Sequence, residues 1–401
     1  MPRRLLWIRR DYDAASGAGV RVGGLIVGLA AHFDIVERTP EAVLGAELAA
    51  VPARPRGRAS LRPSWHPGRP SGFTRRVATV LDAAAVTHGA DAIVVSHPAT
   101  YARLGGARPA APLVLDAFDL LWTQSGTRQV ELGPSRRPGL RQRVRRGLTL
   151  PLHALRAAAA RRLELRLLAG ADRVWVCSEL DRERLIRSAS RRSRVEVVPN
   201  FVPAPPAPEP PEDPVFESAA SARGDRILFV GAMGYHANRS GLSFFLDSVW
   251  PRVREQRPSA RLQVVGRWPD WARPGDEYRQ PGVEVLGFVE DLEPLWRAAT
   301  VFVCPLLVGS GTRIKILDAW AHGVPVVSTP VGAEGLDAVS GRDLVLAESP
   351  DELATALLTL LDDAEARQRL AAAAQARWRA EATPELAVER AAESLQRLLE
   401  R

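Results

Sequence analysis

The stretch GSGTRIKILDAW, residues 309–320, carries the residue types best able to bind an anionic ligand. Two glycines come before an expected helix over 312–322, and a hydroxyl and two cations follow in its first turn: Gly309, Gly311, Thr312, Arg313 and Lys315. Free backbone amides and the helix dipole attract negative charge at such a start, and the cations add to the attraction. The stretch predicts a phosphate or diphosphate cradle; a capped and solvated helix start is the alternative.

Lys315 is the only lysine of the chain, because Lys and Arg together number 54 and 53 of these are arginine. Lysine presents a compact point charge, whereas arginine is longer, planar and bidentate. Retention of one ammonium here favours a binding role, with chance as the alternative. Asp318 follows three residues later on the neighbouring helix face, where it can accept hydrogen bonds from sugar hydroxyls.

A second glycine-bearing turn begins SGAGVRVGGLIVGLA, residues 16–30. Its glycines permit close backbone approach, and amides at a helix start attract an anion. The turn is not a clean GxGxxG fingerprint, because only Glu37 could be the acidic residue of a dinucleotide site. A structural turn and a ligand loop are equally supported. The loop interpretation makes Gly17, Gly19 and Arg21 the candidate ligand-binding residues of this turn.

Short apolar runs alternate with helical patterns, which is typical of parallel sheets with crossover helices. The strands expected in the first half are 4–8, 92–96, 112–116, 173–177 and 194–198. Those expected in the second half are 226–231, 261–266, 283–287, 300–305 and 324–329. Ligands bind beyond the carboxyl ends of parallel strands, so the residues after each strand are the candidates for a site.

Proline occupies seven of the twelve positions in PAPPAPEPPEDP, residues 203–214, which excludes helix and sheet and favours an extended connector. The chain is therefore expected to contain four parts. They are a first α/β domain over 1–202, a Pro-rich linker over 203–224, a second α/β domain over 225–382, and a C-terminal helix over 383–401 that can cross back to the first domain.

The composition is that of a globular protein, with 46% hydrophobic and 25% charged residues. Cys177 and Cys304 are too few and too far apart for a disulfide framework or a zinc site, and no metal-binding motif stands out. No secretory signal is found, and no apolar run reaches the roughly 18 residues of a membrane span. A cytoplasmic location is expected.

The net charge of +8 is concentrated in residues 135–166, where ten arginines and one acid, Glu164, give +9. Apolar residues recur there every three or four positions, which predicts an amphipathic segment. We expect peripheral docking on the anionic inner leaflet; a packed helix with a solvated basic face is the alternative. A nucleic-acid partner is not expected, because the patch lacks interleaved aromatic residues.

Several stretches together resemble a GT-B retaining glycosyltransferase of the group 1 type, in the bacterial branch associated with exopolysaccharide assembly. They are ADRVWVCSELDRERL (171–185), VEVVPN (195–200), FVGAMGYHANRSGLSFFLDSVWPRV (229–253), LQVVGRWP (262–269), VEVLGFVEDL (283–292) and GSGTRIKILDAWAHGVPVVSTPVGAEGL (309–336). The resemblance implies two Rossmann-like domains facing a cleft. The first would take a saccharide or lipid-linked acceptor and the second a nucleotide-diphosphate sugar, with no other cofactor and no metal.

The same resemblance places the family's paired acids, eight positions apart, on Ser310 and Asp318. Asp318 is then the carboxylate for the ribose hydroxyls, and Ser310 departs from the pattern. The Arg and Lys that many relatives carry after the first strand of the second domain fall on Ala232 and Asn238. Other cations must then meet the diphosphate, and the candidates are Arg239, Arg267, Arg313 and Lys315.

Phe288 lies where such relatives contact the nucleobase. Their acceptor-side His falls on Phe118, for which Asp116, Asp119 or His97 can substitute; a satisfied structural group is an equally supported alternative for each of the three. The acceptor-side residues that the resemblance then implies are Gly17, Gly19, Arg21 and Asp116. The predicted catalytic residues are Arg313, Lys315, Asp119 and His97. The predicted donor site comprises Gly231, Arg239, Arg267, Phe288, Ser310, Gly311, Thr312, Arg313, Lys315 and Asp318.

Two other interpretations stay open. A nucleotide-sugar epimerase also has two such domains, although its acid/base set cannot be located in this sequence. With Ser310 and Phe118 in place of functional groups, a non-catalytic module that binds a nucleotide-sugar or a membrane is the other.

Overall fold

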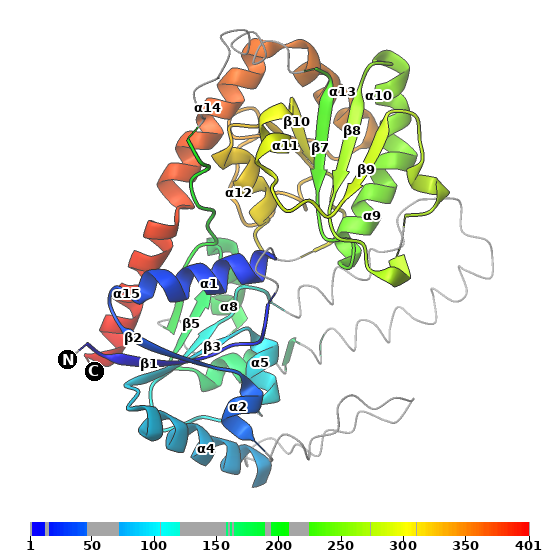
Figure 1. Cartoon of the computed structure of the whole chain (residues 1–401). Coiled ribbons are helices and arrows are strands. Elements are labelled where there is room, and N and C mark those ends of the chain that lie inside the picture. The colour runs from blue at the N-terminus through cyan, green and yellow to red at the C-terminus, as the bar shows by residue number, and fades with distance from the viewer. Residues whose placement is uncertain are drawn as a thin grey trace. The chain divides into compact units, whose positions relative to one another are not determined.

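The computed structural model describes residues 2–12, 16–45, 72–104, 106–120, 158, 161–162, 164–188, 194–207, 224–272, 274–309 and 311–400. They form two compact units (Figure 1). The first contains the described residues of Met1–Trp122, Arg156–Pro199 and Ala387–Arg401, and the second contains those of Asn200–Leu386. The chain leaves the first unit at Pro199, and the expected linker is described only at 203–207 and 224.

The first unit is built on a six-stranded sheet of order β2-β1-β3-β4-β5-β6. Its strands are β1 (Arg4–Ile8), β2 (Asp34–Arg38), β3 (Ala92–Ser96), β4 (Leu113–Asp116), β5 (Arg173–Val176) and β6 (Val195–Val197). All neighbouring strands are parallel, so their carboxyl ends share one edge. The chain order reverses between β1 and β3, and open parallel sheets bind ligands at such a switch point.

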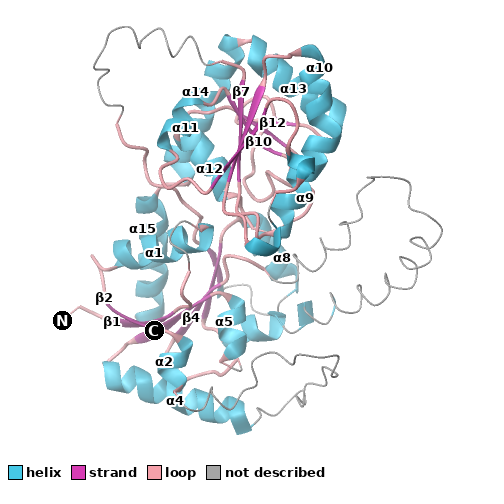
Figure 2. Ribbon diagram, turned by 45° about the vertical axis from the view of Figure 1, so that its right-hand side comes forward, coloured by secondary structure: helices cyan, strands magenta, loops and turns pink. Residues whose placement is uncertain are grey.

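Helices cover both faces of this first sheet (Figure 2). One face packs on α2 (Pro40–Leu44), α4 (Gly72–His88), α5 (Pro98–Arg103) and α8 (Glu179–Ser188). The other face presents Trp175, whose Nε1 donates to Ser394 Oγ at 2.9 Å in α15 (Pro384–Leu399). Helix α1 (Gly17–Leu29) lies against α15 (Figure 1). The two helices approach so closely at Gly28 that a Cβ there would collide with Val388. The C-terminal helix is thus part of the first unit's core.

The second unit has a six-stranded sheet of order β12-β11-β10-β7-β8-β9. Its strands are β7 (Arg226–Val230), β8 (Arg261–Val265), β9 (Val283–Gly287), β10 (Val301–Cys304), β11 (Val326–Ser328) and β12 (Val345–Leu346). All of these pair in parallel, and the chain order reverses between β7 and β10. Two Rossmann-like α/β units are present, which confirms the predicted fold class.

Alternating residues of β7 enter two separate cores, one on each face of the second sheet. Ile227 and Phe229 pack with α9 (His236–Phe244), the π-helical turn Phe245–Val249, α10 (Trp250–Gln256) and α13 (Pro350–Asp362). Leu228 packs with α11 (Glu293–Ala298), α12 (Ile314–Ala321) and α14 (Ala364–Glu381). None of the helices within the described ranges combines the length and apolar character that a membrane crossing requires.

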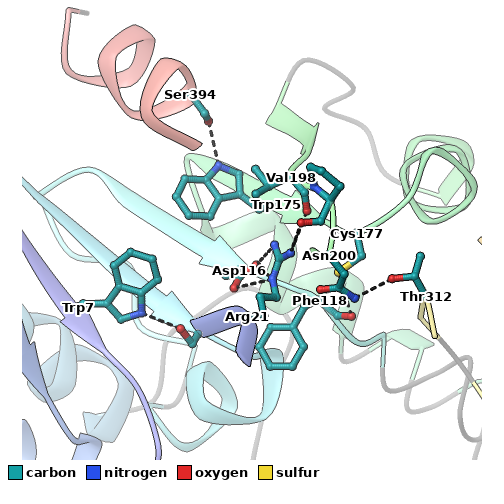
Figure 3. Close-up of polar contacts among 12 residues, drawn as sticks. Trp7, Arg21, Asp116, Phe118, Trp175, Cys177, Val198, Asn200, Thr312 and Ser394 are labelled. Carbon is teal, nitrogen blue, oxygen red and sulfur yellow. Dashed lines mark hydrogen bonds and ion pairs between the residues drawn. The ribbon is translucent and has the colours of Figure 1, made fainter. Parts of the chain in front are cut away.

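A buried ion pair joins helix α1 to the carboxyl end of strand β4 in the first unit (Figure 3). Arg21 of α1 and Asp116 of β4 are both fully buried, with Nη2 and Oδ1 2.7 Å apart. Arg21 Nη1 also donates to the carbonyl oxygens of Val198, at 3.0 Å, and Pro199, at 2.9 Å. The sequence places Arg21 and Asp116 on the acceptor side. The structure instead makes them an internal tie between α1, β4 and the segment after β6, because each neutralises the other.

Arg21→Met is expected to lower the free energy of unfolding of the first unit by about 3–5 kcal/mol, because it leaves the Asp116 carboxylate buried without its cation. The urea midpoint of the transition that unfolds this unit measures the loss. Adding Asp116→Leu removes both charges and is expected to recover most of the stability. If the double variant is no more stable than Arg21→Met, the ion pair is not the source of the effect.

Candidate functional site

The switch point of the second sheet brings the loop after β7 close to the start of α12. Gly231 follows β7, and its amide donates to the carbonyl oxygen of Val265 at 2.9 Å. A Cβ on Gly231 would lie 2.9 Å from Lys315 Nζ and 2.8 Å from Cγ of Asn238. Glycine at this position therefore leaves the space that the lysine ammonium fills.

Side chains of two elements, α9 and β7, contact the Lys315 ammonium. Nζ lies 2.7 Å from Oδ1 of Asn238 in α9, and it lies over the ring of Phe229 in β7, 5.3 Å from the centroid. Asn238 Nδ2 donates to the carbonyl oxygen of Ala232 at 2.9 Å, which turns its amide oxygen toward Lys315. The one lysine of the chain is thus fixed at the carboxyl edge of the sheet.

The charge on Lys315 is only partly compensated by the protein. Burial lowers the pKa of Lys315 to about 8; nearby Cys304 opposes this shift and the positive charge of Arg313 adds to it. A negative group placed beside a buried ammonium favours its charged form. An anionic ligand would therefore both bind to Lys315 and restore its proton affinity.

The Arg313 side chain forms hydrogen bonds with the backbone of the turn before α12. Its Nη1 donates to the carbonyl oxygen of Gly311 at 2.7 Å, and its Nη2 donates to that of Val331 at 3.4 Å. Gly309 has φ 144°, and a Cβ there would lie 2.5 Å from Nη2 of Arg313, so the turn requires glycine. The buried guanidinium braces the turn and adds positive potential. A direct contact between Arg313 and a diphosphate stays a prediction.

Thr312 is held by a residue that the sequence analysis did not select. Asn200 Nδ2 donates to Thr312 Oγ1 at 2.6 Å (Figure 3). The accepted bond leaves the hydroxyl hydrogen of Thr312 for an oxygen acceptor. Asn200 ends the VEVVPN stretch, so its polar side chain after a strand and a proline was the available signal. Ser310 lies outside the described residues.

Asp318 lies one helical turn beyond Lys315 and is half-buried. Burial raises the pKa of Asp318 to about 6, while the charge of His322 lowers it. An ammonium and a carboxyl group therefore project from neighbouring turns of one helix. Within the described ranges, no three His, Cys, Asp or Glu side chains come together as a metal-binding group.

Two arginine–aromatic stacks lie after the strands at the same edge of the second sheet. Arg267 lies over Phe288, 4.5 Å from the ring centroid, and Phe288 is 51% exposed. Arg239 lies over Trp271 at 4.6 Å and donates to the carbonyl oxygen of Met233. Phe288 thus offers an exposed ring where a planar base could stack, and Trp271 is an exposed ring that sequence patterns did not single out.

In the first unit, a side chain of the turn before α1 already accepts a hydrogen bond from one of the backbone amides at the helix start. The amide of Gly19 donates to Ser16 Oγ at 3.0 Å, which is an N-cap, and Gly17 is the first residue of the helix. This arrangement fits the structural interpretation of the turn.

His97 follows β3 with φ 76°, and its ring lies edge-on to Phe118, 5.2 Å between centroids. Its Nδ1 accepts a hydrogen bond from the amide of Ala99 at 3.0 Å. Burial, and then Arg10, lower the pKa of His97 to about 4. At neutral pH the ring is therefore neutral and carries its hydrogen on Nε2, where it can donate a hydrogen bond. A catalytic role for His97 stays a prediction. Asp119 lies half-buried beyond β4.

Two tandem Rossmann-like units, with a cationic helix start at the switch point of the second, define the GT-B class of proteins. Residues 224–363 match the family described as glycosyl transferases group 1, and residues 16–200 match the glycosyl transferase 4-like domain. Two glycosyltransferase family models thus match this chain, one in each half of the sequence.

Solved structures share this fold at low sequence identity. Sucrose-phosphate synthase from Thermosynechococcus elongatus is 17% identical with a TM-score of 0.68, covering 99% of this chain and 100% of that one. HepE from Anabaena, in complex with UDP and glucose, is 14% identical with a TM-score of 0.66, covering 98% of this chain and 100% of that one.

Curated relatives match over shorter stretches. A 44.6 kDa protein encoded in the cps region of Klebsiella pneumoniae is 30% identical over 132 residues, which are 30% of this chain and 33% of that protein. The phosphatidyl-myo-inositol mannosyltransferase of Mycobacterium leprae is 33% identical over 162 residues, 37% of this chain and 41% of that protein. The matches thus span less than half of either relative.

Lys315 is expected to titrate near pH 8, because burial and Arg313 oppose its charged form. As the only lysine, it gives a single side-chain signal when lysine is labelled with ¹³C at Cε, and NMR follows that signal against pH. In urea-unfolded protein the same signal should titrate near the ordinary value of 10.5. A folded-state midpoint at that ordinary value would contradict the buried placement.

Proposed function

We propose that the protein is a retaining glycosyltransferase that moves a sugar from a nucleotide-diphosphate sugar to a saccharide or lipid-linked acceptor. The observation that carries this proposal is the Lys315 ammonium, 2.7 Å from Asn238 and against Gly231 at the switch point of the second sheet. This is where open α/β sheets bind ligands, and the ammonium meets the amides of a helix start there.

In this mechanism the diphosphate leaves as the glycosidic bond breaks, and negative charge develops on its oxygens. Lys315 and the amides at the start of α12 stabilise that charge without a metal, and Arg313 adds to the positive potential. Asp318 accepts hydrogen bonds from the ribose hydroxyls, and Phe288 contacts the base. The acceptor hydroxyl attacks on the same face and passes its proton to the departing phosphate oxygen, so no side-chain base is required.

Cell-surface polysaccharide or glycoconjugate synthesis is the proposed setting. A relative in the Klebsiella cps region and a phosphatidyl-myo-inositol mannosyltransferase support it, because both names point to cell-surface or lipid-linked glycans. Solved neighbours with UDP, and with UDP and glucose, support a nucleotide-sugar donor.

Lys315→Ala is expected to reduce transfer by about 10²–10³-fold with the fold intact, because it removes a preorganised cation from the leaving diphosphate. UDP-, GDP- and TDP-sugars are tested for thermal shift and for nucleotide release, with and without membrane extract. A shift without release would favour a non-catalytic module, and neither effect with any donor would refute the transferase proposal.

A matched pair of glycine variants separates Lys315 placement from general damage to the loop. Gly231→Ala should weaken nucleotide binding, because its Cβ would displace Nζ and Asn238. Gly234→Ala in the same loop should bind normally, because its Cβ would meet only Pro269 Cγ at 4.0 Å. Equal nucleotide binding by the two variants would contradict a contact between Lys315 and the nucleotide.

We further propose that residues 135–166 dock on an anionic membrane surface, where a lipid-linked acceptor would lie. All but six residues of this segment lie outside the described residues, and the support is its charge of +9. Each arginine near an anionic bilayer contributes about 1 kcal/mol. In flotation assays we expect recovery on vesicles that contain phosphatidylglycerol to exceed recovery on neutral phosphatidylcholine vesicles and to fall at high salt; equal recovery on both would refute docking.

A further inference from the structure

The sequence contains only two asparagines, Asn200 and Asn238, and both contact side chains at the start of α12. Each is buried, with 6% of its surface exposed. The amide oxygen of Asn238 accepts from the Lys315 ammonium. Asn200 donates from Nδ2 to Oγ1 of Thr312 at 2.6 Å (Figure 3). The hydroxyl and the ammonium of the candidate site are thus each held by an asparagine.

The bond from Asn200 sets the direction of the Thr312 hydroxyl. An amide nitrogen can only donate, so Oγ1 of Thr312 accepts this bond. The hydrogen on Oγ1 therefore points away from Asn200 and is left for a different acceptor. Thr312 comes three residues before Lys315, so a hydroxyl donor and an ammonium donor flank the same helix start. Ionised phosphate oxygens are strong acceptors for donors of both kinds.

The amides at the start of α12 add to these donors. Arg313 is the N-cap residue of α12, and its described side chain makes no cap hydrogen bond to the helix amides. In contrast, Ser16, Ser349 and Asp363 cap helices α1, α13 and α14 with their side chains. The N-cap residue of α12 thus leaves the first-turn amides to other acceptors. An anion at this helix start would meet these amides and the Thr312 hydroxyl together.

Asn200 is itself placed by the packing of the second unit. The two residues after it, Phe201 and Val202, are buried. The amide of Val202 donates to the carbonyl oxygen of Ala382 at 3.1 Å, and its carbonyl oxygen accepts from Nε1 of Trp378 at 3.2 Å. A buried hydrogen bond adds only modestly to stability, because the amide gives up its bonds to water. Stability alone therefore does not explain a buried asparagine at this position.

We propose that Asn200 is a positioning residue for the donor diphosphate: it holds the Thr312 oxygen and thereby directs the Thr312 hydrogen to a diphosphate oxygen. The hydroxyl is oriented before the ligand arrives, so less rotational freedom is lost on binding. Asn200 acts through Thr312 and does not touch the reacting atoms. The binding half of this inference rests on the proposed function. The orientation half concerns the unliganded protein alone.

NMR of protein labelled with ¹⁵N-asparagine tests the orientation half without any ligand. Two side-chain NH₂ groups are expected, and Asn200→Ala identifies the one that belongs to Asn200. In Thr312→Val the hydrogens of this group should exchange with water about fivefold faster, because their acceptor is lost. The NH₂ group of Asn238 donates to Ala232 and should be unchanged, which makes it the internal control. Unchanged exchange of the Asn200 group in Thr312→Val would overturn the inference.

Calorimetric titration tests the binding half with UDP, GDP and TDP, and with the matching nucleosides uridine, guanosine and thymidine. Affinity for the nucleoside diphosphate should fall about fivefold in Asn200→Ala and about 10–100-fold in Thr312→Val, because a bond to a charged oxygen is weakened or lost. Nucleoside affinity should stay unchanged in both variants. Asn200→Ala should cause no further loss when it is added to Thr312→Val. The matched control Thr312→Ser keeps the hydroxyl and should bind as the wild type does.

The outcomes separate this inference from the proposed function. Normal binding of the nucleoside diphosphate by Asn200→Ala would overturn the inference alone. An equal loss of nucleoside and nucleoside diphosphate affinity would do the same, because it indicates a purely structural role, as would additive losses in the double variant. No binding of any nucleoside diphosphate by the wild type would overturn the proposed function and the binding half together. The NMR result would then still decide whether Asn200 orients the Thr312 hydroxyl.

Discussion

The second unit depends on one constraint: a single ammonium must be held at the edge of its sheet with little water around it. Taking a charge out of water is unfavourable, and this desolvation lowers the pKa of Lys315. The absent Cβ of Gly231 makes the space, and, within the part of the chain that the structure describes, Asn238 and Phe229 contact Nζ. One neutral oxygen and one ring do not neutralise a cation, so the site is electrostatically complete only with an anion bound.

The cation at this place comes from a different sequence position than the one that the resemblance predicts. The resemblance to GT-B enzymes leads one to expect a basic residue at 238, and this chain has Asn238 there. Lys315 reaches the same place from α12, because its Nζ lies 2.7 Å from the Asn238 side chain. The amide oxygen of Asn238 serves as the acceptor that such a cation needs. A lysine at 238 and one at 315 would compete for one space, which accounts for the chain carrying only the latter.

Buried parallel strands could be predicted because both their faces are apolar, and they therefore appear as short hydrophobic runs. The edge strand β2 has only Ile35 and Val36 as apolar residues and gives a weak signal. The helical segment His236–Gln256 is interrupted by a π-helical turn before Pro251, which lacks the amide donor of a regular helix. The partners of buried polar side chains could not be predicted in this way. Arg21 follows a glycine turn and suggests a ligand loop, yet its partner Asp116 is 95 residues away in the sequence. Sequence spacing cannot show that pairing, since it is made only when α1 and β4 meet in the fold.

Helix α12 carries both ionisable groups of the candidate site. Lys315 and Asp318 occupy positions i and i+3, so they lie on neighbouring turns of one helix face. The helix dipole disfavours a cation in the first turn, where Lys315 lies, by about 0.3–1 kcal/mol. The local stability of α12 therefore does not explain the lysine. An anion bound at this helix start would favour both the amides and the ammonium, and it therefore gives a physical reason for a cation at a position that the helix dipole disfavours.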